Sequence, residues 1–478
     1  MTVERDSQTN PGIQTFLGWV GDSYEAFADN RADQWRDQEM YDGVQWTPDQ
    51  VQQLKDVLGV YALTINKTFP TVNMLLGMQM ASQTDIAAKG RTIQDTDVTQ
   101  IASGSIKFVL DQNEGRSKIS DAFRGAVIPG FGCIEVLKNP DPRKEIVKLA
   151  VRSWQYMWWD HHGDPWFDVD TTRYVFLQKW VDLHDLVGTY PEKKREIEEA
   201  YFTAPSTAVS PFYPYAETGS IWRPFAATND GNSFNGAMWF DKVRKRVMPV
   251  EMWYTVRKEL TFAIFADGRA FELEGRPDTE IGELVRACQQ VVKGYVPKMR
   301  VTNFLGDVLL EDGPTPHGHD EFPFATFVGY TNRFNQPYGV PRQIRDMDIE
   351  INKRRTTALA KLNAKRIVVE EGAVDDMAVL RQEAMRPDSL IILKRGKHLN
   401  ENILVEDQSN EIKSQMDLLR ESEREIGEIS GGISESMGYE SNVISRVALQ
   451  QKSQRGNMIT ASLFENLKKG KSRLGYLS

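Results

Sequence analysis

The chain contains few of the residues that build disulfide frameworks and metal sites. Its 478 residues include two cysteines, Cys133 and Cys288, and six histidines. Two cysteines so far apart in sequence provide no disulfide framework, and free thiols are typical of a reducing compartment. The sequence therefore favours a reduced, cytoplasmic environment over that of a small secreted scaffold.

Long apolar runs and common catalytic signatures are also missing. No window of about 18 consecutive apolar residues occurs, so we expect no membrane-spanning helix. The N-terminal stretch MTVERDSQTNPGIQ is polar and lacks the apolar centre of a secretory signal. The chain has no G-x-x-x-x-G-K-[ST] phosphate loop and no G-x-S-x-G nucleophile elbow. These absences argue against the enzyme classes that depend on such motifs.

Basic residues are fewer than acidic residues in this chain. The chain has 58 Lys and Arg residues against 67 Asp and Glu residues, which gives a net charge of −9. Proteins that read a DNA sequence are usually basic, and each phosphate contact adds affinity by releasing counterions. An acidic chain is therefore a poor candidate for tight DNA binding over its whole surface, but it suits a surface along which DNA slides.

Tryptophan, in contrast, is abundant, with eleven residues in the chain. Five of them fall within one short span: Trp154, Trp158, Trp159, Trp166 and Trp180. Aromatic rings bury large areas and favour cores and interfaces, so we predict a large aromatic core or a subunit interface in this region. A platform on which sugars or bases stack is the alternative interpretation.

Helical and extended patterns alternate along the chain and predict an α+β protein that is mainly helical. Thr47 followed by Pro48 predicts a short capped helix. Longer helices are expected at 66–80, 97–113, 118–127, 182–201, 278–292, 340–365, 374–385, 410–429 and 445–469. Strands are expected at 132–137, 145–151, 173–181, 246–265, 300–310, 366–370 and 389–393, with 240–330 forming a small α/β module.

The segment 340–365 is predicted to be one uninterrupted helix about 39 Å long. Its apolar residues form a narrow seam: Val340, Ile344, Met347, Ile351, Ala358 and Leu362. Many of its other residues are basic, among them Arg342, Arg345, Lys353, Arg354 and Arg355. A long helix with so narrow a seam is expected to pack against another helix or a neighbouring subunit.

The segment 430–442 is predicted to be a loop between two helices. It reads SGGISESMGYESN and contains no His, Cys, Lys or Asp. Gly431 and Gly432 provide backbone freedom. The loop therefore has the composition of a segment that contacts a partner without reacting with it.

Two clusters contain metal-ligating side chains. In Asp160-His161-His162-Gly163-Asp164 the adjacent histidines would point opposite ways on an extended chain, so we predict a polar turn. His317 and His319 lie beside prolines, which favours a loop. Gly130 and Gly132 match part of a dinucleotide fingerprint but precede a strand, so we predict a tight strand entry instead. Neither a metal ion nor a cofactor is predicted.

Several segments taken together resemble the portal proteins of short-tailed, double-stranded DNA bacteriophages. The resemblance is carried, in chain order, by YDGVQWTPDQVQQL, LTINKTFPTVNMLLG, SWQYMWWDHHGD, TTRYVFLQKWVDLHDL, FPFATFVGYTNRFNQPYGVPRQIRDMDIEINKRRTTAL and ISGGISESMGYESNVISRVALQQKSQRGNMITASLFENL. The ordered set, which spans about residues 41 to 467, is far more specific than any one of its pieces.

The resemblance implies a ring of about twelve subunits at one capsid vertex. It divides the chain into wing (1–180 and 367–428), stem helices (181–205 and 339–366), clip (206–338), tunnel loop (429–444) and a C-terminal helix toward the crown (445–478). The residues implied beside the DNA channel are Gly431, Gly432, Ser434, Met437, Tyr439, Asn442 and Arg446. Arg446 departs from the family pattern, which has glycine at that position.

The resemblance also implies partners and a location. The expected partners are double-stranded DNA bound without sequence specificity, the terminase large subunit, head-completion, adaptor or tail proteins, the major capsid protein and a scaffold protein. Assembly is expected in the host cytoplasm and the mature location in the virion, with no membrane contact. Two alternatives are a metal-dependent or glycan-active enzyme using the turn at 160–164, and a general DNA-binding module using the basic residues of helix 340–365.

Overall fold

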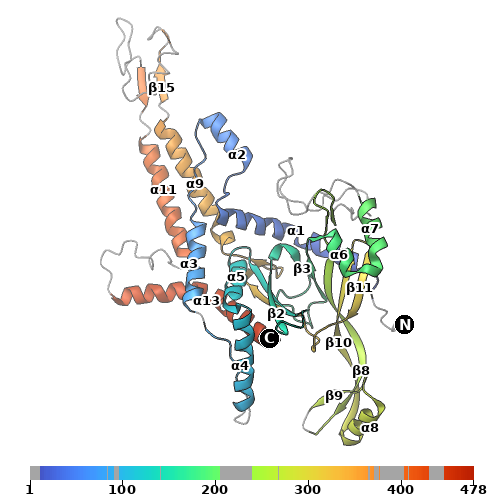
Figure 1. Cartoon of the computed structure of the whole chain (residues 1–478). Helices are drawn as coiled ribbons and strands as arrows, with labels where there is room; N and C mark the ends of the chain where they lie inside the picture. Colours follow the sequence, from blue (N-terminus) through green and yellow to red (C-terminus); the bar gives the residue numbers. More distant parts are fainter. Residues whose placement is uncertain are drawn as a thin grey trace, which may run out of the picture.

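The computed structural model describes residues 11–82, 84–90, 96–139, 141–204, 239–266, 269–363, 366–370, 376, 403–406, 409–429 and 446–478. Within them, helices and sheets combine as expected of an α+β protein. Figure 1 shows a central body from which a pair of helices projects at one end and a long β-ribbon projects at the other. Among the described helices, none has the length and apolar character needed to span a bilayer.

The helix α1 (Ile13–Asp42) runs across the body and changes character along its length. Its first half buries an apolar row at helical spacing: Phe16, Val20, Tyr24 and Phe27. Its second half buries a polar row instead: Asn30, Arg31, Gln34 and Asp37. The helix ends at Gly43, whose φ of 88° is readily adopted only by glycine and whose N–H bonds to Glu39 and Met40.

The largest sheet has the strand order β11-β10-β8-β4-β3, with β9 paired to β8. Its strands are β3 (Met157–Trp159), β4 (Tyr174–Gln178), β8 (Val250–Ile264), β9 (Ala270–Glu272), β10 (Gln290–Leu305) and β11 (Val308–Pro314). Pairing of β8 with β10 continues from Val250↔Phe304 to Ile264↔Gln290, so these strands leave the body as a ribbon. The ribbon ends in a lobe that contains α8 (Asp278–Ala287).

The aromatic core lies between the first half of α1 and this sheet. Trp159 is fully buried, stacks on Phe131 with ring centroids 4.7 Å apart, and packs against Phe27 at 4.8 Å. Trp158 and Trp154 belong to the same cluster, and Trp166 packs against it. The prediction of an aromatic core around these tryptophans is confirmed.

A second sheet has the order β12-β1-β2, with strands β1 (Phe131–Lys138), β2 (Val147–Arg152) and β12 (Phe324–Val328). The helix α5 (Gly115–Val127) packs on β1, and the last helix, α13 (Arg446–Leu477), packs on β12. The predicted strands at 132–137 and 145–151 are confirmed. Gly130 has a φ of 97°, and a Cβ there would lie 2.3 Å from the Tyr338 backbone, which explains this glycine as a tight strand entry.

Other helices and short strands complete the body. The helices are α2 (Pro48–Gln53), α3 (Thr68–Ala81), α4 (Thr96–Gln112), α6 (Leu183–Thr189) and α7 (Lys194–Thr203). The short strands are β5 (Val181–Asp182), β6 (Phe240–Asp241), β7 (Arg246–Val247), β13 (Tyr330–Thr331) and β14 (Pro337–Tyr338). The short capped helix predicted at Thr47 and Pro48 is confirmed as α2, and it begins with a capping box in which Thr47 and Gln50 bond to each other's backbone.

Three sequence-based expectations need correction. The expected helix at 182–201 is divided into α6 and α7 by a short 3₁₀ turn that begins at Pro191, because proline lacks the N–H that a continuous helix needs. The expected helix at 278–292 ends at Ala287, and β10 begins at Gln290. The region 240–330 is not a separate module, because β8 pairs with β4 and β12 pairs with β1.

Candidate channel-facing and assembly elements

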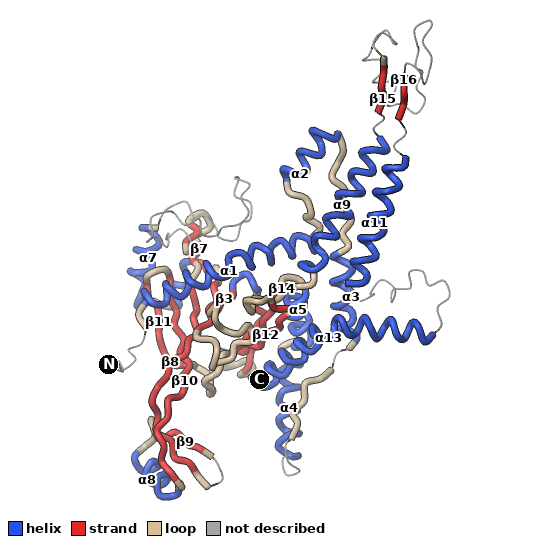
Figure 2. The backbone as a smooth tube through the Cα atoms, turned by 180° about the vertical axis from the view of Figure 1, so that it is seen from behind, coloured by secondary structure: helices blue, strands red, loops and turns tan. Residues whose placement is uncertain are grey.

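The two projecting helices are α9 (Pro341–Asn363) and α11 (Ser409–Ile429). Figures 1 and 2 show them side by side as an arm, with the strands β15 (Arg366–Val369) and β16 (Ile403–Glu406) paired at its tip. The prediction of a long helix at 340–365 and of another at 410–429 is confirmed. The expected helix at 374–385 and strand at 389–393 lie outside the described residues.

The arm is held together by a small apolar core. Ile344 and Ile351 of α9 and Leu419 and Ile426 of α11 are buried against one another. Arg354 adds a hydrogen bond from its Nη1 to Oε1 of Gln415 at 3.4 Å. The packing partner of α9 is therefore α11, and not the segment 182–201, which lies at the far side of the body in both views.

The base of the arm is joined to α1 by ion pairs around the buried carboxylate of Asp37. Arg342 Nε lies 3.0 Å from Asp37 Oδ2, and Arg345 Nη1 lies 3.1 Å from Asp33 Oδ1. Arg342 also donates to Asn30 Oδ1 at 2.8 Å. Burial raises the pKa of Asp37 to about 6, although both arginines lower it. These two arginines, predicted as residues of a stem helix, join the arm to the body.

The other basic residues of α9 are placed differently. Arg354 pairs with Glu350 one turn earlier on the same helix. Lys353 is exposed and Arg355 is half-buried. Of the five basic residues singled out on this helix, Lys353 is therefore the exposed one.

A polar ladder on α9 binds the extended segment that leads into α3. Asp348 accepts hydrogen bonds from Thr68 N at 3.1 Å and from Gln45 Nε2 at 3.0 Å. Asn352 accepts from Ile65 N at 2.6 Å, and Thr356 accepts from Leu63 N at 3.3 Å. Burial raises the pKa of Asp348.

Sequence reasoning missed this ladder and the carboxylates of α1. The ladder residues Asp348, Asn352 and Thr356 are spaced by four along α9, so they share one helix face. That spacing of short polar side chains beside an apolar seam was the available signal. For Asp33 and Asp37 no comparable signal exists, because their partners lie about 300 residues away in the chain.

The structure describes the C-terminal helix but not the predicted loop before it. Residues 430–445, which contain the predicted channel residues Gly431, Gly432, Ser434, Met437, Tyr439 and Asn442, lie outside the described residues. Arg446 is the first residue of α13, as the expected start of a helix near 445 required.

The second half of α13 packs inward and does not lead away from the body. Leu463, Leu467 and Leu474 are buried in the core around α5 and β12. Gly470 lies against β12, where a Cβ would come within 2.7 Å of the Thr326 carbonyl oxygen. The leucines of this half complete the core of the small sheet, and a helix directed toward a crown stays a prediction.

Neither histidine cluster forms a metal site. The rings of His161 and His162 lie 3.8 Å apart in a turn, where His162 N donates to Asp160 Oδ1 at 3.1 Å. The ring of His317 stacks on Trp253 at 5.5 Å. Within the described residues, no group of three or more His, Cys, Asp or Glu side chains is arranged to hold a metal ion.

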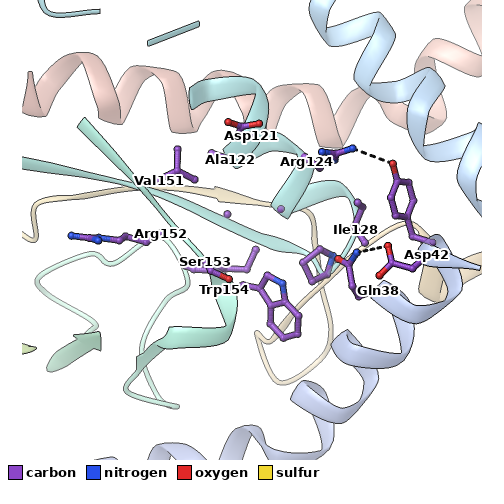
Figure 3. Close-up of a pocket in the computed structure, with 15 residues that line it drawn as sticks. Gln38, Asp42, Asp121, Ala122, Arg124, Ile128, Val151, Arg152, Ser153 and Trp154 are labelled. Atoms are coloured by element: carbon purple, nitrogen blue, oxygen red, sulfur yellow. Dashed lines mark hydrogen bonds between the residues drawn. The ribbon is translucent and has the colours of Figure 1, made fainter. Parts of the chain in front are cut away.

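A hollow of about 360 Å³ lies between α1, α5 and the end of β2 (Figure 3). Its polar groups are engaged with one another: Arg124 donates to the Tyr41 hydroxyl at 3.3 Å and Gln38 donates to Asp42 at 3.0 Å. Arg152, also on its wall, pairs with Glu135, whose pKa burial raises to about 7. The hollow thus presents polar groups that hold neighbouring elements together.

The geometry defines an α+β protein with an aromatic-cored body, a two-helix arm and a β-ribbon. A comparison with protein families matches residues 17–478 to the family described as Phage P22-like portal protein. The chain belongs to that family, as the resemblance predicted, and membership supports a portal role in a bacteriophage. No curated protein matches the chain.

Proposed function

We propose that the chain is the subunit of a ring of about twelve copies that forms the DNA channel at one vertex of a phage capsid. DNA would enter through this channel during packaging and leave through it during ejection. Terminase and head-completion or tail proteins would dock on the ring. The observation that carries the proposal is the family match over residues 17–478.

The two-helix arm is the best candidate for the stem, with α9 and α11 as its two helices. The family pattern places the clip between two stem helices, and the segment 364–408 joins α9 to α11. This replaces the expected stem helix at 181–205 and the expected clip at 206–338. The loop 429–444, which follows α11, stays the proposed tunnel loop, and double-stranded DNA its proposed contact.

The charge of the chain supports a sliding contact with DNA. A net charge of −9 per copy makes any ring of these subunits strongly acidic. Acidic walls repel phosphates, so few counterion-releasing contacts would hold the duplex in place. The family is generally structural, and we accordingly propose no enzymatic role for this chain.

Imaging of the purified protein by electron microscopy tests the proposal. A ring with a central hole is the expected result, and a stable monomer under all assembly conditions would contradict it. A second experiment addresses the loop: a phage that lacks its portal gene is complemented with the chain carrying Gly431→Pro and Gly432→Pro. Rings that assemble but fail to package DNA are expected, and normal packaging would refute the role of the loop.

A further inference from the structure

The helix α4 presents an apolar stripe to solvent. Val98, Ile101 and Phe108 are 69%, 71% and 50% exposed, and α4 has no buried residue. Together with Ser105 and Gln112 these residues repeat at intervals of three and four. That spacing is the seam by which one helix packs against another element.

The opposite face of α4 is the one that contacts the body. The Ser103 hydroxyl accepts a hydrogen bond from Ala88 N at 3.0 Å, and Leu110 packs against the core around α5. The stripe is therefore not the side that holds α4 in place. An exposed apolar row on a helix already held by its other face is typical of an interaction surface.

The stripe forms one wall of a trough whose other wall is the turn between β1 and β2. The trough has a volume of about 510 Å³, and Ile146, which is 74% exposed, lines it opposite Ile101 and Phe108. It continues past Asn113 and Glu145 into a second hollow of about 380 Å³. The exposed residues Lys144 and Lys148 line the second hollow, together with Glu145.

The lobe at the end of the β8–β10 ribbon has the complementary chemistry. The helix α8 has no buried residue, and its Val285 is 43% exposed. Its exposed acidic residues are Asp278, Glu280 and Glu283. The stretch 272–286 contains five acidic residues and two arginines. The lobe thus presents exposed carboxylates and an apolar residue, and the trough presents an apolar stripe that continues toward Lys144 and Lys148.

The positions of the two surfaces fit a ring. Figures 1 and 2 both show α4 and α8 at the end of the molecule opposite the arm, on different flanks. A closed ring uses heterologous contacts, in which one patch of each copy meets a different patch of the next. We propose that the α8 lobe of one copy packs into the α4 trough of its neighbour, with Val285 on the apolar stripe. The proposal rests on the proposed ring-forming function.

Disulfide cross-linking tests this contact. The variant Phe108→Cys, Val285→Cys is made in a Cys288→Ser background, and rings are oxidised and separated on a denaturing gel. A ladder of covalent multimers is expected. The matched control replaces Val285→Cys by Val243→Cys, which is 88% exposed and lies outside the lobe. Rings that give no ladder would overturn the contact and leave the ring function standing, whereas absence of rings from the unmodified chain would overturn the function.

Charge reversal provides a second readout. Lys144→Glu with Lys148→Glu places like charges across the contact and is expected to raise the concentration needed for assembly by about tenfold or more. Adding Glu280→Lys and Glu283→Lys should restore assembly. Circular dichroism checks that each variant folds. Folded variants that assemble normally after the first change, or that stay defective after the second, would contradict the proposal.

Discussion

The body and the arm are attached to α1 by opposite kinds of chemistry. The first half of α1 buries aromatic rings against the large sheet, while the second half buries Asp37 and its neighbours against the base of α9. Apolar burial is non-directional and tolerates small shifts, whereas buried ion pairs require defined geometry. The body is therefore stabilised by the large apolar surface that it buries, whereas a few directional contacts set the orientation of the arm.

The largest expected effect is in the body. Trp159→Ala removes a fully buried ring that packs against Phe27 and Phe131. We expect a loss of about 3–5 kcal/mol in the free energy of unfolding, measured by urea denaturation with circular dichroism. Ile146→Ala, at an exposed site, is the control and should change stability by less than about 0.5 kcal/mol. Equal effects of the two substitutions would show that the aromatic core does not dominate the stability of the chain.

The next effect concerns the joint between α1 and the arm. Asp37→Ala leaves Arg342 and Arg345 without their buried partner, so we expect a loss of about 3 kcal/mol. The loss should be local: hydrogen exchange should quicken in the first turns of α9 and stay unchanged in β4 and β8. Asp346→Ala removes an exposed carboxylate of the same helix α9 and is the matched control. Hydrogen exchange that quickens equally in α9, β4 and β8 would contradict a local effect at this joint.

The pH dependence of the joint has a defined sign. Burial raises the pKa of Asp37 from 3.8 to about 6, so the folded chain holds a proton that the unfolded chain has released. This contribution to stability is therefore full below about pH 4 and is lost as pH rises to about 6, amounting to on the order of 3 kcal/mol.

Comparison with Asp37→Asn isolates this contribution, because the variant cannot titrate at residue 37. Urea denaturation at steps between pH 4 and pH 7 should show that the unmodified protein loses stability relative to the variant as pH rises. A constant difference would mean that the carboxylate of Asp37 titrates normally. Glu135, whose pKa is raised to about 7, is present in both proteins and cancels in the comparison.

The smallest effect is expected at the surface of the arm. Lys67 Nζ lies 2.9 Å from Glu423 Oε1, with both side chains more than one-third exposed. Exposed pairs of this kind contribute about 0–1 kcal/mol and are screened by salt. Lys67→Ala should lower stability by less than about 1 kcal/mol, and the difference should vanish in 1 M NaCl. A large loss of stability that does not depend on salt would contradict the description of this pair as an exposed, screened contact.

Local patterns predicted many elements of this fold and fewer of its contacts. The helices α3, α4, α5, α9, α11 and α13 and the strands β1 and β2 follow from hydrophobic periodicity and capping signals. The ends of β10 and α8 were misjudged because the ribbon residues near 290 alternate weakly and are half exposed. Pro191 indicates a break in the sequence, but the charged residues that follow it predict a continuous helix, which the structure does not contain.

In the candidate site too, local patterns predicted the elements but not their contacts. Its loop at 430–442 stays a prediction from composition and from the family resemblance, whereas the basic residues of α9 lie on a helix as predicted. Their roles depended on partners that are remote in sequence, since Arg342 meets Asp37 across about 300 residues. A guanidinium on an exposed helix and one in a buried ion pair are identical in a sequence.

The sequence by itself determined the family, the mixed fold class, the long helix at 340–365 and the aromatic centre, because these depend on residue order and short-range periodicity. The tertiary structure decided that α9 pairs with α11, that Arg342 and Arg345 bind α1, and that the end of α13 fills the core around β12. Such pairings depend on which surfaces remain unburied once each element has formed. That choice is settled only by the packing of the whole chain.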